Sequence, residues 1–280
     1  MTRVAVLGLG IMGHGIADNF LKHGYGVAVW NRSPEKADGL VAQGARRAGS
    51  VADAMQGAEL VFEVTANDES AREVWLGKGG IVAHANVEQT LITCATLSVA
   101  FVDELAKTTA EKGQAFFDMP MTGSRQGAES GTMVLLAGGD EPKLNALKPH
   151  LEKVASQVKY FGPAGSGMRM KLVLNCLQAV HLAGFGEAMR LAKSMGLDTQ
   201  KAGEMLVEKP GGATTQLAWR DYQNHPEPIN FAVELIAKDE AYALRNINPQ
   251  LTPLITSTLA SYQKAIAEGY AQDDWTIVTR

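Results

Sequence analysis

Two side chains of this sequence are suited to proton chemistry on a small substrate. Lys171 and Asn175 lie four residues apart in an Ala-, Leu- and Met-rich stretch over residues 168–195, which predicts one long helix. Both would therefore project from the same helix face. A protonated lysine can stabilise a developing oxyanion and give it a proton, and an asparagine can orient the lysine or the substrate. Taken alone, a lysine here is also typical of a solvated helix position.

A glycine-rich turn near the start of the chain predicts a dinucleotide site. Gly8, Gly10 and Gly13 follow an apolar run over residues 4–7 and precede a helical pattern. The first glycine permits a tight turn, the second lets the backbone approach a pyrophosphate, and the third lets the helix pack close to the sheet. The helix N-terminus then faces the phosphates. We assign the whole turn to the cofactor site: Gly8, Leu9, Gly10, Ile11, Met12 and Gly13.

The residues that end the second strand predict which dinucleotide is bound. A site for NAD usually has Asp or Glu there, which holds the ribose 2′-hydroxyl. This chain instead has Asn31, Arg32 and Ser33 after an apolar run over residues 27–30. A guanidinium pairs with a 2′-phosphate, which a carboxylate would repel. These residues favour NADP(H) over NAD(H). The alternative is that Arg32 is an ordinary solvated turn residue.

Alternating strand and helix patterns indicate how these residues are positioned. Helical spacing lies between the predicted strands and is clear over residues 99–111. This alternation predicts an α/β fold with a Rossmann-type doubly wound, mostly parallel sheet. Val64 and Thr65, at the end of one predicted strand, are assigned to the cofactor site as well. The predicted strands cover residues 4–7, 27–30, 45–48, 60–64, 91–94, 115–118, 133–137 and 159–161.

A glycine-rich segment over residues 162–167 is the predicted domain boundary. It separates an NADP-binding domain, residues 1–162, from an all-α domain, residues 163–280, entered through the long helix, which Gly196 is expected to end. Strand patterns are nearly absent from the second domain, and its helices are expected to break at residues 210–212, 226–228, 249 and 253. Since the long helix starts where the nucleotide domain ends, its first turns should lie near the carboxyl ends of the strands, where the cofactor binds. That location favours an active-site role for Lys171 and Asn175.

Composition excludes several classes of function. The 280 residues are 46% hydrophobic and 20% charged, so a sizeable core is expected, and the net charge of −4 gives no basic surface for nucleic acid. No apolar stretch reaches eighteen residues, so neither a transmembrane helix nor a membrane partner is expected. Cys94 and Cys176 are too few for a disulfide framework. A strand is predicted almost at the N-terminus, which leaves no room for a signal peptide, so a cytoplasmic protein is expected. No bound metal is expected.

Three other segments carry little information when each is taken alone. Thr96 follows a predicted strand, and Lys238 precedes an aspartate in the last domain. The segment over residues 118–124 contains a proline and a glycine, and its hydroxyl and amide groups could hold a carboxylate. The alternative for that segment is a plain turn.

Together these segments resemble the β-hydroxyacid dehydrogenase family, which includes 3-hydroxyisobutyrate dehydrogenase and the glyoxylate/succinic semialdehyde reductases. The resemblance covers essentially the whole chain, and Gly-Ser at 123–124 is closer to the glyoxylate reductase branch. Five motifs occur in the family's order: GLGIMGHGIADNF at 8–20, ATLS at 95–98, DMPMTGSRQGAESGT at 118–132, GSGMRMKLVLN at 165–175 and FAVELIAKDEAYAL at 231–244.

The resemblance implies a role for individual residues. Lys171 corresponds to the catalytic lysine and Asn175 to its partner on the same helix. Thr96 corresponds to the threonine beside the nicotinamide, and Lys238 to a lysine near the cofactor. The resemblance also implies a homodimer or homotetramer. We expect its subunit interface to bury the long helix over residues 180–191. The segment that binds the substrate carboxylate would comprise Thr122, Gly123 and Ser124.

Some residues depart from the family's pattern. Ala95 replaces a usual serine, Val99 a usual proline, and Met121 with Thr122 a usual Val-Ser pair, so the substrate pocket should differ. Glu63 places a carboxylate in an otherwise apolar strand, and the sequence explains it only as a position at a sheet edge or strand end.

These observations leave three functions open. The first is an NADPH-dependent reductase of a small aldehyde or 2-oxo acid, such as glyoxylate or succinic semialdehyde. The second is a 3-hydroxyacid dehydrogenase of the 3-hydroxyisobutyrate type, which works in the oxidative direction. The third is a non-catalytic dinucleotide-binding assembly module, which the presence of both Lys171 and Asn175 disfavours.

Overall fold

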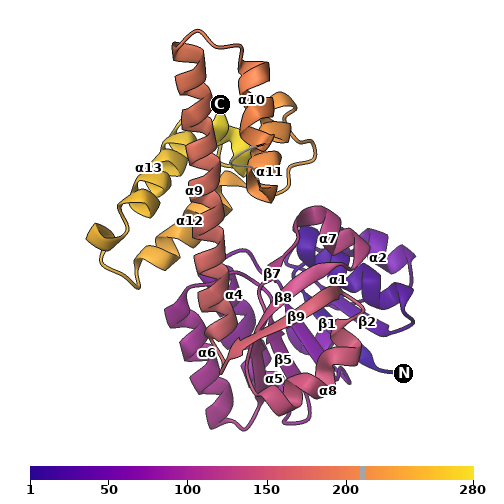
Figure 1. Ribbon diagram of the computed structural model, residues 1–280. Coiled ribbons are helices and arrows are strands. Elements are labelled where there is room, and N and C mark those ends of the chain that lie inside the picture. Colours follow the sequence, from indigo (N-terminus) through magenta and orange to yellow (C-terminus); the bar gives the residue numbers. More distant parts are fainter. Residues whose placement is uncertain (209–211) are drawn as a thin grey trace. The chain divides into compact units, whose positions relative to one another are not determined.

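The computed structural model describes residues 1–208 and 212–280 and divides into two compact units, Met1–Lys171 and Leu172–Arg280 (Figure 1). The division falls within one helix, α9 (Ser166–Ser194). The domain boundary at residue 162 stays a prediction. The helix break expected at residues 210–212 lies largely outside the described residues.

The first unit contains a mixed sheet with helices on both of its faces. Within the described residues the sheet has nine strands in the order β3-β2-β1-β4-β5-β6-β8-β7, and β9 pairs with β8. The strands are β1 (Arg3–Leu7), β2 (Gly26–Trp30), β3 (Arg46–Arg47), β4 (Leu60–Glu63), β5 (Thr90–Thr93), β6 (Ala115–Asp118), β7 (Met121–Thr122), β8 (Met133–Gly138) and β9 (Ala155–Gly162). The helices are α1 (Ile11–Lys22), η1 (Pro34–Ala37), α2 (Asp38–Ala42), α3 (Val51–Met55), α4 (Asp68–Leu76), α5 (Ile81–His84), α6 (Val99–Glu111), α7 (Ser124–Ser130) and α8 (Glu141–Leu151).

Two apolar cores, one on each face, hold these helices to the sheet. Phe20 of α1 and Leu40 of α2 pack with Val6 on one face, and Trp75 of α4 and Leu105 of α6 pack into the core of the other. Burial on both faces explains why the strands are continuous apolar runs. The predicted doubly wound, mostly parallel fold is confirmed.

The register of the parallel strands brings their last residues to one level. Leu7 of β1 pairs with Trp30 of β2 and with Glu63 of β4. Thr93 of β5 pairs with Glu63 and with Asp118 of β6. Ligands of open α/β sheets bind outside the carboxyl ends of the strands, so this edge is where a cofactor site is expected.

The segment after Asp118 differs from the turn weighed in the sequence analysis. Met121 pairs antiparallel with Leu135 in the short strand β7, and α7 begins at Ser124. Gly123 and Ser124 have φ values of +134° and +57°, which turn the chain sharply between the two elements. A two-residue strand has no detectable periodicity, and the pairing partner lies well downstream, so local pattern could not predict it.

Where the structure describes it, the second unit is helical apart from an isolated bridge between Ala232 and Asp274. Its described elements are the later part of α9, then α10 (Thr199–Glu208), α11 (Ala213–Gln223), α12 (Val233–Leu244), η2 (Pro249–Leu251), α13 (Pro253–Ala267) and η3 (Trp275–Thr279). The predicted stop at Gly196 is confirmed, since its φ of +75° follows the last turn of α9 and its amide donates to the Lys193 carbonyl.

Among the helices of residues 1–208 and 212–280, α9 alone is long and apolar enough to cross a membrane by length and composition. No transmembrane helix was expected from the sequence, because that expectation was based on uninterrupted apolar runs, and α9 contains charged residues between its apolar ones. In its most apolar window, 44% is buried within the chain. Core helices of globular proteins satisfy the same criteria.

Candidate dinucleotide and active site

The glycine turn has the close packing that a dinucleotide site requires. Gly8 has a φ of +100°, and an added Cβ would collide with the Val64 carbonyl oxygen. A Cβ at Gly13 would collide with the carbonyl oxygen of Gly8. At Gly10, in contrast, a Cβ would meet no described atom within 4 Å. Packing therefore explains the first and third glycines, whereas the second leaves room for a group bound at the helix N-terminus.

The N-terminus of α1 fits a pyrophosphate. Gly10 is the N-cap, and no side chain among the described residues caps the helix. The first turn contains no acidic residue, so the unpaired N–H groups and the helix dipole favour an anion there. The residues present thus fit the phosphates of a dinucleotide.

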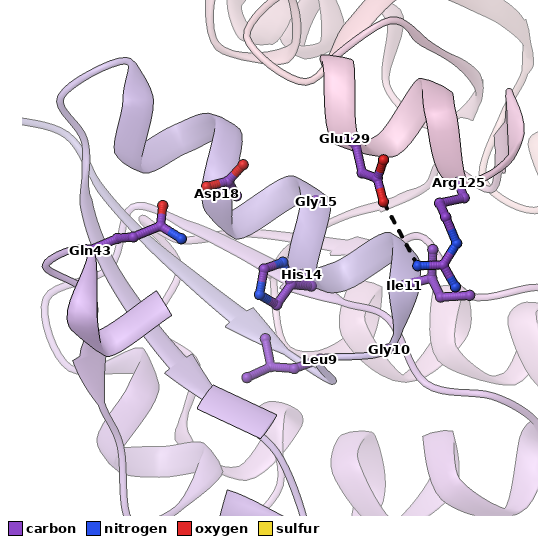
Figure 2. Close-up of a pocket in the computed structure, with 9 residues that line it drawn as sticks. All are labelled: Leu9, Gly10, Ile11, His14, Gly15, Asp18, Gln43, Arg125 and Glu129. Atoms are coloured by element: carbon purple, nitrogen blue, oxygen red, sulfur yellow. Dashed lines mark ion pairs between the residues drawn. The ribbon is translucent and has the colours of Figure 1, made fainter. Parts of the chain in front are cut away.

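A pocket of about 430 Å³ opens beside this turn (Figure 2). Gly10 and Ile11 line it from the turn, and Arg125 and Glu129 from α7. The two charged side chains form an ion pair of 3.7 Å between Nη1 and Oε1. The glycine turn therefore borders an open groove on its α7 side.

The residues that end β2 hold the turn in place. The amide of Leu9 donates to Oδ1 of Asn31 at 2.9 Å, and Nδ2 of Asn31 donates to the Ser33 carbonyl at 3.0 Å. Asn31 therefore fixes the turn. The neighbouring Arg32 is exposed and makes no hydrogen bond or ion pair with any described residue, so its guanidinium is available to an anionic ligand.

The ends of β4 and β5 carry the next predicted cofactor residues. The Val64 amide donates to the Leu7 carbonyl at 2.8 Å, which holds the start of this loop against β1. Thr96 lies in the loop after β5, and a hydrogen bond from the backbone of Ser98 holds this loop in place. Ser98 N donates to Oδ1 of Asp68 at 2.8 Å. The glycine turn, residues 31–33, residues 64–65 and Thr96 thus follow adjacent strands at one sheet edge.

Asp118, at the end of β6, fixes the start of α9. Its carboxylate accepts hydrogen bonds of 2.6 Å from the backbone amides of Gly165 and Met168. Burial raises the pKa of this carboxyl to about 6, and the two amide donors lower it in part. Lys171 lies about one turn beyond Met168, so Asp118 sets where the helix that carries Lys171 begins. In the sequence, Asp118 is recognisable only as the start of a motif.

The predicted substrate segment lies in the same unit. Thr122 is half-buried on β7, whereas Gly123 and Ser124 are exposed at the start of α7. The sharp turn described above leaves these backbone groups accessible. Their role in binding a carboxylate stays a prediction.

In the second unit, a buried carboxylate joins two predicted site residues. Nδ2 of Asn175 donates to Oδ2 of Asp239 at 2.6 Å. Nζ of Lys238 lies 3.1 Å from Oδ1 of the same carboxylate. Asp239 is fully buried, so it fixes the amide of Asn175 and the ammonium of Lys238 together. Lys171, one turn before Asn175 on α9, is 9% exposed, which disfavours the solvated surface position. In the sequence, Asp239 is distinguished only as the neighbour of Lys238.

Glu240, next to Asp239, is a buried carboxyl whose pKa is raised above its ordinary value. Both of its oxygens lack a hydrogen-bond partner among the described residues. Burial, and then the negative charge of Asp239, raise the pKa of Glu240 to about 8. The hydroxyl of Tyr262 is buried without a described partner as well. Burial, and then the Glu240 charge, raise the pKa of the Cys176 thiol to about 12.

We expect Glu240→Gln to stabilise the protein at alkaline pH. The folded-state pKa of about 8 lies above the ordinary value of 4.5. Between pH 4.5 and about pH 8, the folded chain therefore keeps a proton that the unfolded chain has lost. The free energy of unfolding falls as pH rises through this range. Glutamine removes that loss, although its amide also lacks partners. The melting temperature at pH 8.5 should rise by roughly 2–4 °C, as for a gain of about 1 kcal/mol.

The control for this experiment is Glu268→Gln, because Glu268 is exposed after α13. Thermal melting of both variants and of the wild type is compared at pH 5 and pH 8.5. The control should follow the wild type at both values. Equal pH dependence of Glu240→Gln and the wild type would show that Glu240 does not hold this proton.

Metal ligands do not gather in the part of the chain that the structure describes. No group of three or more His, Cys, Asp or Glu side chains there could hold a metal ion. Both cysteines are buried and free.

Comparison with known proteins matches both halves of the chain to dehydrogenases. Residues 3–162 match the family described as the NAD binding domain of 6-phosphogluconate dehydrogenase. Residues 165–280 match the family described as NAD-binding of NADP-dependent 3-hydroxyisobutyrate dehydrogenase. The two matches together cover nearly the whole chain.

Individual relatives match over nearly the whole of this chain. The chain is 30% identical to NAD-dependent L-serine dehydrogenase of Pseudomonas aeruginosa, over 100% of this chain and 97% of the relative. It is 30% identical to the chloroplastic glyoxylate/succinic semialdehyde reductase 2 of Arabidopsis thaliana, over 98% of this chain and 78% of the relative. A solved structure of Psf3 in complex with NADP+ and 2-OPP superposes with a TM-score of 0.90 at 25% identity, over 99% of this chain and 98% of the other.

Proposed function

Because this chain belongs to the β-hydroxyacid dehydrogenase family and is an NAD(P)-dependent oxidoreductase acting on CH–OH and carbonyl groups, we propose that it reduces a small aldehyde or 2-oxo acid with NADPH. Glyoxylate and succinic semialdehyde are the substrates we favour. The observation that carries the proposal is Arg32. It is exposed in the turn that follows β2, where a carboxylate would select NAD, and it makes no ion pair with any described residue. The Arabidopsis reductase named above supports the choice of substrate.

The proposed mechanism uses Lys171 as the general acid. A nicotinamide dinucleotide held by the glycine turn would supply the hydride that reduces the carbonyl carbon. Negative charge then develops on the carbonyl oxygen, where the Lys171 ammonium stabilises it and donates a proton. Asn175, fixed by Asp239, orients the lysine or the substrate. Thr122 and Gly123 hold the substrate carboxylate with hydroxyl and amide groups, and in the reverse direction Lys171 acts as the base.

An activity screen tests this proposal. The purified chain is assayed with glyoxylate and succinic semialdehyde against NADPH and NADH, and with L-serine and 3-hydroxyisobutyrate against NADP+ and NAD+. The highest kcat/KM should belong to an aldehyde or 2-oxo acid with NADPH. Cofactor binding without turnover on any substrate would favour the non-catalytic module instead.

A second candidate is oxidation of a 3-hydroxyacid. It is favoured by the likeness to an NAD-dependent L-serine dehydrogenase, which extends over the whole chain. L-Serine is itself a 3-hydroxyacid, so the same lysine would accept the hydroxyl proton. A higher kcat/KM for hydroxyacid oxidation than for carbonyl reduction would establish this alternative.

We also propose that the chain forms a homodimer or homotetramer through α9. Apolar residues of this helix are exposed in the single chain, Val173 at 62%, Leu177 at 54% and Leu191 at 56%, and so is Met195 at 70%, directly after its last turn. Their spacing places them along one side of the helix, continuous with the exposed Gly184. Exposed apolar surface of this extent usually marks an interface.

We expect light scattering at micromolar concentration to give at least twice the mass of one chain. The double substitution Leu177→Glu and Leu191→Glu should reduce it to one chain mass, because buried charges would face each other across the interface. Leu254→Glu, at a leucine 69% exposed on α13, is the matched control. A wild-type mass of one chain would refute the proposed oligomer.

A further inference from the structure

Glu63 is a buried carboxylate surrounded by hydrogen-bond donors. Its side chain is fully buried. Oε1 accepts from the Thr65 amide at 2.6 Å, and Oε2 accepts from Nε1 of Trp75 at 3.1 Å and from Oγ1 of Thr93 at 2.7 Å. Two of these donors, the amide and the indole, cannot accept a proton in return. Donors therefore converge on both oxygens of the carboxylate, as a buried polar group requires.

The position of Glu63 in the sheet relates this charge to the cofactor edge. It is the last residue of β4 and pairs with Leu7, the last residue of β1. Strands β2 and β3 extend the sheet on one side of β1, and β4 and β5 extend it on the other. The chain thus reverses direction between β1 and β4, and ligands of open α/β sheets bind at this reversal.

Glu63 also fixes the loop that borders this crevice. The bond to the Thr65 amide closes a tight turn directly after β4. The same loop presents the Val64 carbonyl against Gly8, where an added Cβ would collide. Oγ1 of Thr65 is buried without a hydrogen-bond partner among the described residues, so it still has hydrogen-bonding capacity. The carboxylate therefore holds a predicted cofactor segment in one conformation.

The charge of Glu63 acts on its surroundings. Burial, and then the negative charge of Glu63, raise the pKa of the Cys94 thiol, which begins the next loop after β5. A buried charge is screened by solvent much less than a surface charge. A ligand bound at this edge would therefore experience the Glu63 charge.

We propose that Glu63 is a positioning residue whose fixed negative charge favours the oxidised form of the bound nicotinamide cofactor over the reduced form. This inference rests on the proposed use of a nicotinamide dinucleotide. The oxidised ring carries a positive charge and the reduced ring is neutral, whereas the phosphates are the same in both. A negative charge at the reversal point therefore attracts the oxidised form selectively, and the bound equilibrium shifts toward carbonyl reduction.

The experiment compares the dissociation constants of NADP+ and NADPH for the wild type and Glu63→Gln, by fluorescence and calorimetric titration without substrate. Charges in a protein interact at an effective dielectric near 20, and a difference of about 1.4 kcal/mol between the two forms changes such a ratio by roughly tenfold. Removal of the charge should therefore raise the ratio Kd(NADP+)/Kd(NADPH) by roughly tenfold. The change should come mainly from weaker binding of NADP+.

Two further variants separate charge from structure. Glu63→Gln with Trp75→Phe removes the indole donor that would face the new amide, in case the single variant folds poorly, and should give the same change in ratio. Glu111→Gln removes a carboxylate from the exposed end of α6 and should leave the ratio unchanged. Thermal melting without cofactor checks that each variant is folded.

The outcomes distinguish this inference from the proposed function. If Glu63→Gln weakens both cofactors by the same factor, Glu63 has only a structural role and the inference is wrong. If Glu63→Gln leaves the dissociation constants of both NADP+ and NADPH unchanged, the inference is wrong as well. If the wild-type protein binds no nicotinamide dinucleotide, the proposed function itself is refuted. If the protein binds NAD(H) more tightly than NADP(H), the same ratio is measured with NAD+ and NADH.

Discussion

Lys171→Met should lower kcat by roughly 10²–10⁴-fold, the usual contribution of a positioned general acid. Methionine has similar length and suits a position that is only 9% exposed, but it has neither charge nor proton to give. Folding and cofactor affinity should therefore stay close to the wild type. The measurement is steady-state turnover on the best substrate of the screen, with the NADPH dissociation constant determined for the same variant.

The matched control is Lys193→Met, the same substitution near the exposed end of the same helix. It should keep kcat within about twofold of the wild type, because a solvated lysine stabilises no reacting charge. The assignment of Lys171 as general acid is wrong if Lys171→Met binds NADPH normally and retains more than about a tenth of wild-type kcat. A loss of cofactor affinity together with kcat would indicate a different role.

Arg32→Ala should weaken NADPH binding far more than NADH binding. A hydrogen bond to a charged group contributes about 1.5–3 kcal/mol, which corresponds to roughly 10–150-fold in Kd. Arg32 is exposed and makes no ion pair with any described residue, so its removal should leave the rest of the fold intact. NADH lacks the 2′-phosphate and should bind within about twofold of the wild type. Fluorescence titration of both cofactors measures the difference.

Arg47→Ala provides the comparison for this variant. Arg47 lies on the neighbouring strand β3 and pairs with the Asp38 carboxylate, so its charge is already balanced. Its removal should affect NADPH little. Equal weakening of NADPH and NADH by Arg32→Ala would remove Arg32 from the recognition of the 2′-phosphate, and the preference for NADP(H) would then need another explanation.

The sequence by itself determined the features that depend on neighbouring residues. The apolar run over residues 4–7, the three spaced glycines and the following helical pattern predicted the first strand, turn and helix, all of which the structure contains. The cap of α3 is equally local, since the Ser50 hydroxyl accepts the Asp53 amide at 3.1 Å. The stop at Gly196 followed from the need for a positive φ. Each depends on residues within one or two turns.

Only the tertiary structure decided how the strand ends are linked. The carboxylate of Asp118 accepts from Met168, 50 residues later, and that of Glu63 accepts from Thr93, 30 residues later. Asn175 finds Asp239 at a separation of 64 residues. In the sequence these acidic residues looked like a motif start, an anomaly and a neighbour of Lys238. A buried carboxylate is stable only where donors converge on it, and folding brings those donors together from parts of the chain that no local pattern connects.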